Sequence, residues 1–248
     1  MSVFVSAAWL APTLLALQAQ ALSPASAPVR YKVDDATPSR SVSIQTVTLD
    51  AVPGMNRKDV GKVNEVLKAA TASFASEARQ CGAAAQGRPW EYKSTVDKAV
   101  LSDDYLSVIF AKSTVCAGSP DEQKEARVFA LKTGALVTSR ALFKHMLPGA
   151  KIVTAISKNK ELIRLDEETA GTLIDDSKVI LKIDDIRCGF YLKNTSYRVW
   201  ADGKHLVFYP EFNQPYSFCQ KEYLILPEST GNATQYDPGT RLQPVRTA

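Results

Sequence analysis

One apolar stripe at helical spacing limits the possible fold more than any other feature of this sequence. Between Asn56 and about Gln80, apolar residues recur three and four positions apart, which predicts a long amphipathic helix. The stripe consists of Val60, Val63, Leu67, Ala70 and Phe74. Asn56 lies three residues before Asp59 and suits the N-cap position, where a short polar side chain accepts a backbone hydrogen bond.

The segments around this helix have the alternation and the β-branched or aromatic content of strands. Strands are expected at residues 41–49, 91–100, 105–112, 126–132, 190–192 and 223–226, with a hairpin over 197–208. Helices are expected around Leu142 to Met146 and over about 151–163, with a continuation through Leu173. This order predicts an α+β fold of antiparallel sheets, with the long amphipathic helix in the N-terminal half and a smaller helix-plus-hairpin unit in the C-terminal half.

The N-terminus resembles an export signal. Residues 3–17 are almost wholly apolar, and this run is shorter than the roughly 20 residues of a membrane span. Ala19-Gln20-Ala21 then supplies the small-x-small pattern of a cleavage site, although no Lys or Arg precedes Arg30. We expect residues 1–21 to be removed, so that the mature chain is periplasmic or secreted and has no stable membrane span. A buried N-terminal helix and an uncleaved anchor are the alternatives.

Composition divides the remaining chain into four parts. Residues 22–40 mix Ser, Pro and Ala and are expected to form a linker. Residues 41–133 make an N-terminal α+β half that contains the long helix, and residues 134–227 make a C-terminal half. Ser, Thr, Gly, Asn and Pro dominate residues 228–248, which predicts a flexible tail.

The four cysteines predict disulfides. Neither a Cys-x-x-Cys motif nor a Cys/His cluster is present, which argues against zinc and thiol redox sites. Of three possible pairings, sequence order and local geometry favour Cys81–Cys116 with Cys188–Cys219. A two-residue turn at Asp202-Gly203 would pair Val199 with Leu206. Cys188 and Cys219 then both approach the open end of that hairpin, within about two residues of alignment.

Charge and motifs argue against several classes of function. The net charge of +4 is mild, so the composition does not indicate a nucleic-acid-binding protein. There are only two histidines, and no GxSxG, P-loop, HExxH or dinucleotide glycine motif occurs. The acidic runs at 166–168, 175–176 and 184–185 lie beside Lys and Arg and are interpreted as solvated turns or helix caps. We expect a protein without enzymatic activity, cofactor or metal.

Aromatic residues concentrate near the C-terminus, where ten of the chain's 21 lie between Phe190 and Tyr223. On alternating strands half of them should face a core, whereas the others could form a binding surface, because rigid aromatic side chains are favoured at interfaces. Phe212 and Tyr216 are expected to be exposed anchors, since they lie between turn-forming residues. The candidate partner-binding residues are Trp200, His205, Tyr209, Phe212, Asn213, Gln214 and Tyr216.

The same region carries a family resemblance. The stretch from Asp202-Gly203 through Val207-Phe208-Tyr209-Pro210, followed by Gln214-Pro215-Tyr216 and Leu224-Ile225-Leu226-Pro227, resembles the closing motif of a bacterial cell-envelope domain. Upstream, Gly134 with Leu142-Phe143 and the helix containing Val63-Asn64 resemble earlier elements of that domain. It forms the extracellular part of RsiV-type lysozyme-sensing anti-sigma factors and the non-catalytic domain of PdaC-type peptidoglycan deacetylases.

The resemblance covers about residues 41–227 and implies a two-part α+β domain that works by binding. Arg140 and Ala141 replace acidic residues that are common in the family, and Cys219 lies near an expected glycine. The implied partner is a lysozyme-like peptidoglycan hydrolase, which the protein would inhibit or confer immunity against. The alternative is a peptidoglycan- or glycan-binding envelope module without a protein target. The positive net charge argues mildly against a very basic lysozyme.

Overall fold

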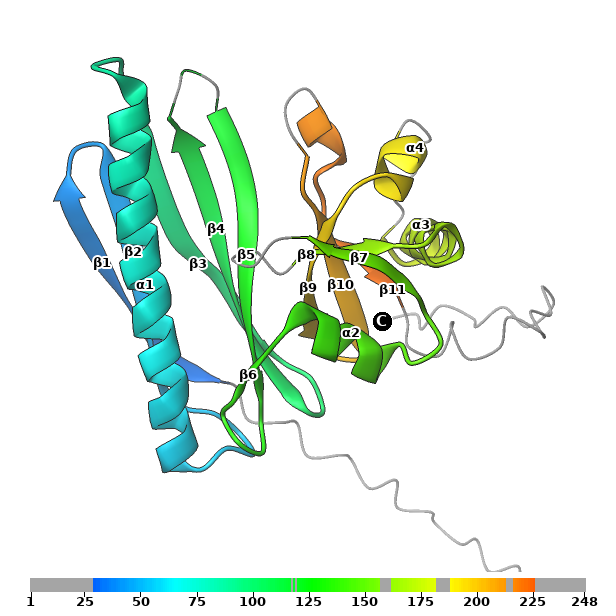
Figure 1. Cartoon of the computed structure of the whole chain (residues 1–248). Coiled ribbons are helices and arrows are strands. Elements are labelled where there is room, and N and C mark those ends of the chain that lie inside the picture. Colours follow the sequence, from blue (N-terminus) through cyan, green and yellow to red (C-terminus); the bar gives the residue numbers. More distant parts are fainter. Residues whose placement is uncertain are drawn as a thin grey trace, which may run out of the picture.

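Two sheets organise the chain (Figure 1). The computed structural model describes residues 29–116, 118, 120–156, 162–181, 188–212 and 216–225. The predicted signal peptide and the predicted tail lie outside the described residues. The first sheet has the strand order β1-β2-β3-β4-β5-β6, and the second has the order β11-β10-β9-β8-β7. The fold is therefore α+β with sheets that are mostly antiparallel.

The first sheet and one long helix form the N-terminal unit. Its elements are β1 (Arg30–Ser39), β2 (Val42–Ala51), α1 (Arg57–Ala85), β3 (Glu91–Leu101), β4 (Tyr105–Val115), β5 (Pro120–Ala130) and β6 (Leu136–Val137). Neighbouring strands are antiparallel except β2 and β3, which are parallel because α1 connects them as a crossover. Figure 1 shows α1 lying across one face of this sheet.

Helix α1 confirms the predicted stripe and cap. The side-chain oxygen of Asn56 accepts a hydrogen bond from the backbone N–H of Asp59 at 2.9 Å. The helix continues beyond the expected end at Gln80, because the buried stripe extends through Cys81 to Ala85. A disulfide joins Cys81 to Cys116, just after β4, with the two Cα atoms 4.6 Å apart. Helix and sheet are thus linked both by packing and by a covalent bond.

The predicted linker over 22–40 is wrong for residues 30–39, which form strand β1 along β2. Residues 30–35 of this edge strand are exposed, including Tyr31 and Val33. Tyr31 and Val33 alternate with Lys32 and Asp34, but the Ser, Pro and Ala on either side gave the segment the composition of a linker.

The second unit contains more strand and a different helix order than the sequence predicted. Its elements are α2 (Ser139–Met146), β7 (Ile152–Ile156), β8 (Leu162–Leu165), α3 (Glu167–Leu181), α4 (Cys188–Lys193), β9 (Tyr197–Asp202), β10 (His205–Pro210), η1 (Tyr216–Cys219) and β11 (Tyr223–Ile225). The helix expected over 151–163 is wrong, because β7 and β8 pair there as antiparallel strands. The strand expected over 190–192 is also wrong, because α4 covers it.

The hairpin of β9 and β10 turns one residue later than predicted, so that Val199 pairs with Phe208 and not with Leu206. Asp202 pairs with His205 and Ala201 with Leu206, so that Gly203 and Lys204 are the turn residues. Of these two, only Gly203 has a positive φ, 59°, which fits a turn with glycine at its first central position. Cys188 and Cys219 lie beyond the open end of this hairpin and form the predicted disulfide, with Cα atoms 5.5 Å apart.

The second unit packs on the face of the first sheet that α1 leaves uncovered. Ile109 and Val128 of β4 and β5 belong to the hydrophobic core of the second unit. Ser107 donates a buried hydrogen bond to the carbonyl of Ala201 at 2.8 Å, and Lys98 forms an ion pair with Asp202 at 3.0 Å. Strand β6 belongs to the first sheet, so the second unit begins after residue 137 instead of at 134.

None of the described helices combines the length and the apolar character needed to cross a membrane.

Candidate functional site

The predicted partner-binding residues on the hairpin face the interior. Trp200 and Tyr209 are buried, with ring centroids 6.2 Å apart. Phe212 is 8% exposed and packs edge-on against Tyr191, so its predicted exposure is wrong. Trp200 and Tyr209 are buried because β9 and β10 are central strands, and almost every residue on both of their faces is buried. Phe212 follows β10 and packs against Tyr191 of α4. Alternation therefore leaves no outward aromatic face on this hairpin.

The other predicted residues contribute little to a described surface. His205 is partly exposed at the hairpin turn. Asn213 and Gln214 lie outside the described residues, as does the side chain of Tyr216 at the start of η1. Their role as partner-binding residues stays a prediction.

An exposed aromatic surface lies instead on α4 and η1. We call Phe190 and Tyr191 on α4, together with Phe218 on η1, the aromatic knob. Phe190 is 71% exposed and Phe218 is 43% exposed. The ring centroids of Phe190 and Tyr191 lie 5.6 Å apart. The ring of Tyr191 also packs against the buried ring of Phe212, with the two centroids 6.5 Å apart. Exposed apolar rings of this size often mark interaction surfaces.

Helical spacing in the sequence could have revealed Phe190. The buried residues of α4, Cys188 and Leu192, are four positions apart, which is the spacing of one helical face. Phe190 lies midway between them and therefore on the opposite, outward face. A strand was expected over residues 190–192, so the helical spacing of these residues was not used.

Three links hold the knob in place. The Cys188–Cys219 disulfide joins α4 to η1. The buried hydroxyl of Tyr197 donates to the carbonyl of Leu192 in α4, and that of Tyr223 donates to the carbonyl of Cys219 at 2.8 Å. Burial raises the pKa of Tyr197 far above its usual value, so this phenol stays a hydrogen-bond donor at any physiological pH. The exposed rings are presented on a fixed scaffold.

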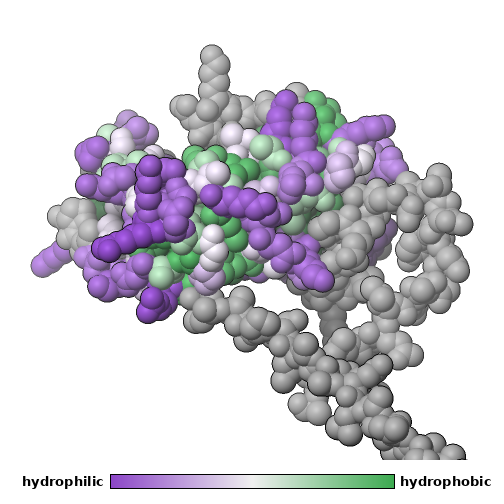
Figure 2. Space-filling view, turned by 90° about the horizontal axis from the view of Figure 1, so that it is seen from below, coloured by the Kyte–Doolittle hydropathy of each residue, from purple (hydrophilic) through white to green (hydrophobic). Residues whose placement is uncertain are grey.

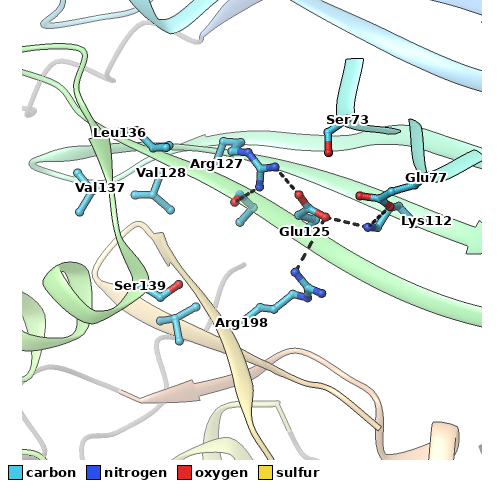
Figure 3. A pocket seen from close by; sticks show the side chains of 12 residues that line it. Ser73, Glu77, Lys112, Glu125, Arg127, Val128, Leu136, Val137, Ser139 and Arg198 are labelled. Carbon is cyan, nitrogen blue, oxygen red and sulfur yellow. Dashed lines mark hydrogen bonds and ion pairs between the residues drawn. The ribbon is translucent and has the colours of Figure 1, made fainter. Parts of the chain in front are cut away.

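A charged groove lies between the two units (Figure 3). It has a volume of about 320 Å³ and is bordered by α1, β5, β6 and β9. Glu125, 8% exposed, lies 2.8 Å from Lys112, contacts Arg127, and lies 4.0 Å from Arg198 of the second unit. In the view from below, Figure 2 shows apolar residues in a band between two strongly hydrophilic parts of the surface.

The charges in this groove set the protonation of Glu125. Burial alone would raise the pKa of its carboxyl group, but Lys112, Arg127 and Arg198 outweigh that effect and lower the pKa to about 2. Glu125 is therefore ionised at neutral pH and acts as an ion-pair partner that links β5 to β9. Glu125 therefore lacks the proton that a general acid must carry at that pH.

Within the described part of the chain, no group of three or more His, Cys, Asp or Glu side chains is arranged to hold a metal ion.

Comparisons with known proteins give structural neighbours only. No protein-family model and no curated protein sequence matches the chain. A DUF3298 family member from Bacteroides fragilis is 10% identical with a TM-score of 0.45, over 84% of this chain and 94% of its own. A DUF3298 family protein from Pseudomonas aeruginosa is 10% identical with a TM-score of 0.47, over 83% of this chain and 94% of its own. The structural neighbours are thus proteins of a bacterial domain family.

Proposed function

We propose that this is an exported, non-enzymatic binding protein that recognises a partner protein through the aromatic knob. The observation that carries the proposal is the exposed ring of Phe190 on a helix held by a disulfide and a buried phenol. Burial of such a ring in a complex favours association, and a preorganised scaffold reduces the entropy lost on binding.

The partner class that we propose is a lysozyme-like peptidoglycan hydrolase, which the protein inhibits or confers immunity against. Support comes from the resemblance of residues 202–227 to the closing motif of the lysozyme-sensing envelope domains. This segment contains η1 and therefore Phe218, the part of the knob that does not lie on α4. Binding to glycan alone is the competing outcome of the experiment below.

Export is the part of the proposal that concerns the N-terminus. Both disulfides are typical of a protein that folds outside the reducing cytoplasm. We expect N-terminal sequencing of the protein from its native host to give a start near Leu22. Recovery of the folded protein with Met1 or Ser2 at its N-terminus would contradict this.

Replacing Phe190 by alanine should weaken partner binding by about 2 kcal/mol, roughly thirty-fold, because a buried aromatic anchor is lost. The melting temperature should change little, since the ring is 71% exposed in the free protein. Calorimetric titration with a c-type lysozyme, together with sedimentation with purified sacculi, measures both partner classes. Phe218→Ala, on the other half of the knob, should act in the same direction.

Val153→Ala provides the matched control. Val153 is also an exposed large apolar residue, 60% exposed, but it lies in β7 at the edge of the second sheet farthest from β11. It should leave binding unchanged. Unaltered lysozyme binding by both phenylalanine variants would exclude the knob as the interface. Binding to sacculi without binding to lysozyme would replace the proposed partner by a glycan.

A further inference from the structure

We propose that the outer edge of β1 pairs with the same edge of a second copy of this chain, so that two first sheets join across a two-fold axis at Val33. This inference goes beyond the proposed function and does not depend on the aromatic knob.

Strand β1 has a strand neighbour on one side only. It is the first strand in the order of its sheet and pairs with β2. From Tyr31 to Ala36 this pairing has no register shift. Helix α1 packs on β2 and β3, and Figure 1 shows β1 at the outer margin of the molecule. Residues 31–36 therefore form a regular edge with no further strand beside it among the described elements.

The backbone groups on the outer side of this edge belong to Tyr31, Val33 and Asp35. The hydroxyl of Thr46 in β2 donates to the carbonyl of Asp34 at 3.4 Å, which places that carbonyl on the side of β2. Because successive residues of an antiparallel strand direct their backbone groups to opposite sides, the N–H and carbonyl groups of residues 31, 33 and 35 face away from β2. Within the described residues, no hydrogen bond occupies these outward groups.

The charges along β1 make the strand complementary to itself. Arg30 and Lys32 precede Val33, whereas Asp34 and Asp35 follow it. In an antiparallel pair about a two-fold axis at Val33, Lys32 of each copy lies opposite Asp34 of the other. Both side chains are exposed, and neither has an ion-pair partner in the described part of the chain. The second copy supplies the missing partner to each of them.

The same charges disfavour the neighbouring registers. An axis at Lys32 would place this side chain opposite itself, and an axis at Asp34 would place two carboxylates opposite each other. Like charges directly opposite each other destabilise a sheet. Charged edge strands commonly resist pairing, but a charge pattern that changes sign about one residue resists every register except the one centred there. The sequence of β1 thus selects a single partner and a single alignment.

Apolar surface on the other face of β1 favours the same partner. Tyr31 is 37% exposed and Val33 is 39% exposed. Their partners in β2, Leu49 and Val47, belong to the core beneath α1, so Tyr31 and Val33 continue that apolar face past the helix. With the axis at Val33, the two valines meet, and each Tyr31 lies diagonal to Val33 of the other copy.

The contact is short and half of it is charged. We therefore expect a weak dimer with a dissociation constant on the order of 10 µM. Added salt should weaken it further, because exposed ion pairs are screened.

The test is a charge-reversal cycle in the full chain. Lys32→Glu places a carboxylate opposite each Asp34, and Asp34→Lys places an ammonium group opposite each Lys32. The double variant Lys32→Glu with Asp34→Lys restores opposite charges. Lys144→Glu is the matched control, because it makes the same change in net charge at an exposed lysine of α2 in the second unit. Sedimentation velocity from about 1 µM to about 1 mM protein measures association.

We expect the wild type and Lys144→Glu to dimerise. Each single β1 variant should weaken dimerisation about tenfold or more, since one substitution alters both symmetric pairs, and the double variant should regain wild-type association. Hydrogen exchange gives an independent readout. The amides of Tyr31, Val33 and Asp35 should become protected as the concentration rises, whereas those of Lys32 and Asp34, which face β2, should be protected at every concentration.

Several results would overturn the proposal. One is a monomer at all concentrations up to about 1 mM. Another is a dimer that Lys32→Glu leaves unchanged or that the double variant does not restore. Slow exchange of the Val33 amide at every concentration would show that the chain itself covers this edge. Lysozyme binding in solution should be unchanged by Lys32→Glu, and dimerisation by Phe190→Ala, so failure of either proposal is visible separately.

Discussion

Replacing Glu125 by alanine should lower the free energy of unfolding by about 3–5 kcal/mol, because its removal leaves buried positive charge only partly compensated. Lys112 is 7% exposed and Arg198 is 10% exposed, so neither is readily resolvated. Glu77 at 3.1 Å compensates Lys112 in part, and Glu211 at 3.1 Å compensates Arg198. Urea denaturation followed by circular dichroism measures the change.

Two variants separate the charge effect from a packing effect. Glu122→Ala removes an exposed carboxylate three residues away on the same strand, and it should change stability by less than about 0.5 kcal/mol. The double variant Glu125→Met with Lys112→Met removes both charges and should lose much less than Glu125→Ala. A loss from the double variant as large as that from Glu125→Ala would show that the ion pair is not the cause.

The same carboxylate predicts how stability depends on pH. The folded-state pKa of Glu125 is lowered from 4.5 to about 2. Its contribution is therefore complete above about pH 4.5 and is lost as the pH falls toward 2, with a total of about 3 kcal/mol. The difference in stability between wild type and Glu125→Gln should shrink over this interval. A difference that stays constant from pH 6 to pH 2.5 would contradict the predicted ionisation.

Removal of the Cys188–Cys219 disulfide by paired alanine substitution should lower the free energy of unfolding by about 4 kcal/mol. The bond closes a loop with a sequence separation of 31, and the unfolded chain gains the conformational entropy of that loop when it is opened. The melting temperature and the urea midpoint should both fall.

The second disulfide is the matched control for this change. Cys81–Cys116 has a similar separation of 35, so its removal should cost a similar amount of stability. Only loss of Cys188–Cys219 should weaken lysozyme binding in protein that is still folded, because this bond joins the two halves of the aromatic knob. Equal effects of both removals on binding would show that the knob does not depend on its disulfide.

Some features of this fold follow from local sequence signals. Helix α1, its Asn56 cap and its buried stripe were predicted because helical spacing and capping act between residues a few positions apart. The order of the four cysteines predicted both disulfides, and the hairpin over 197–208 followed from its turn residues and strand pattern. The turn was displaced by one residue, because Asp202-Gly203 and Gly203-Lys204 are both acceptable two-residue turns and pairing with β8 and β11 selects between them.

Other features depend on contacts between distant residues. Residues 30–35 of β1 are exposed, and pairing with β2 makes this segment a strand. In helix α4, which replaces the expected strand, the disulfide at Cys188 fixes the first turn and the phenol of Tyr197 bonds to the carbonyl of Leu192 near the last residue. Whether an aromatic residue is core or surface is decided in the same way. Phe212 and Phe190 are equally apolar, but Phe212 packs under Tyr191 while Phe190 faces outward.

Short-range patterns account for the α+β class and the long helix, since helical spacing, capping and strand alternation act between neighbours along the chain, and the order of the four cysteines favoured the two disulfides. The exposed knob arises only when α4 and η1 are brought together, and the charged groove around Glu125 only when the second unit packs on the first sheet. Burial, ion pairing and strand-edge exposure are properties of residues brought together across the fold, and a pattern of residue types along the sequence does not contain them.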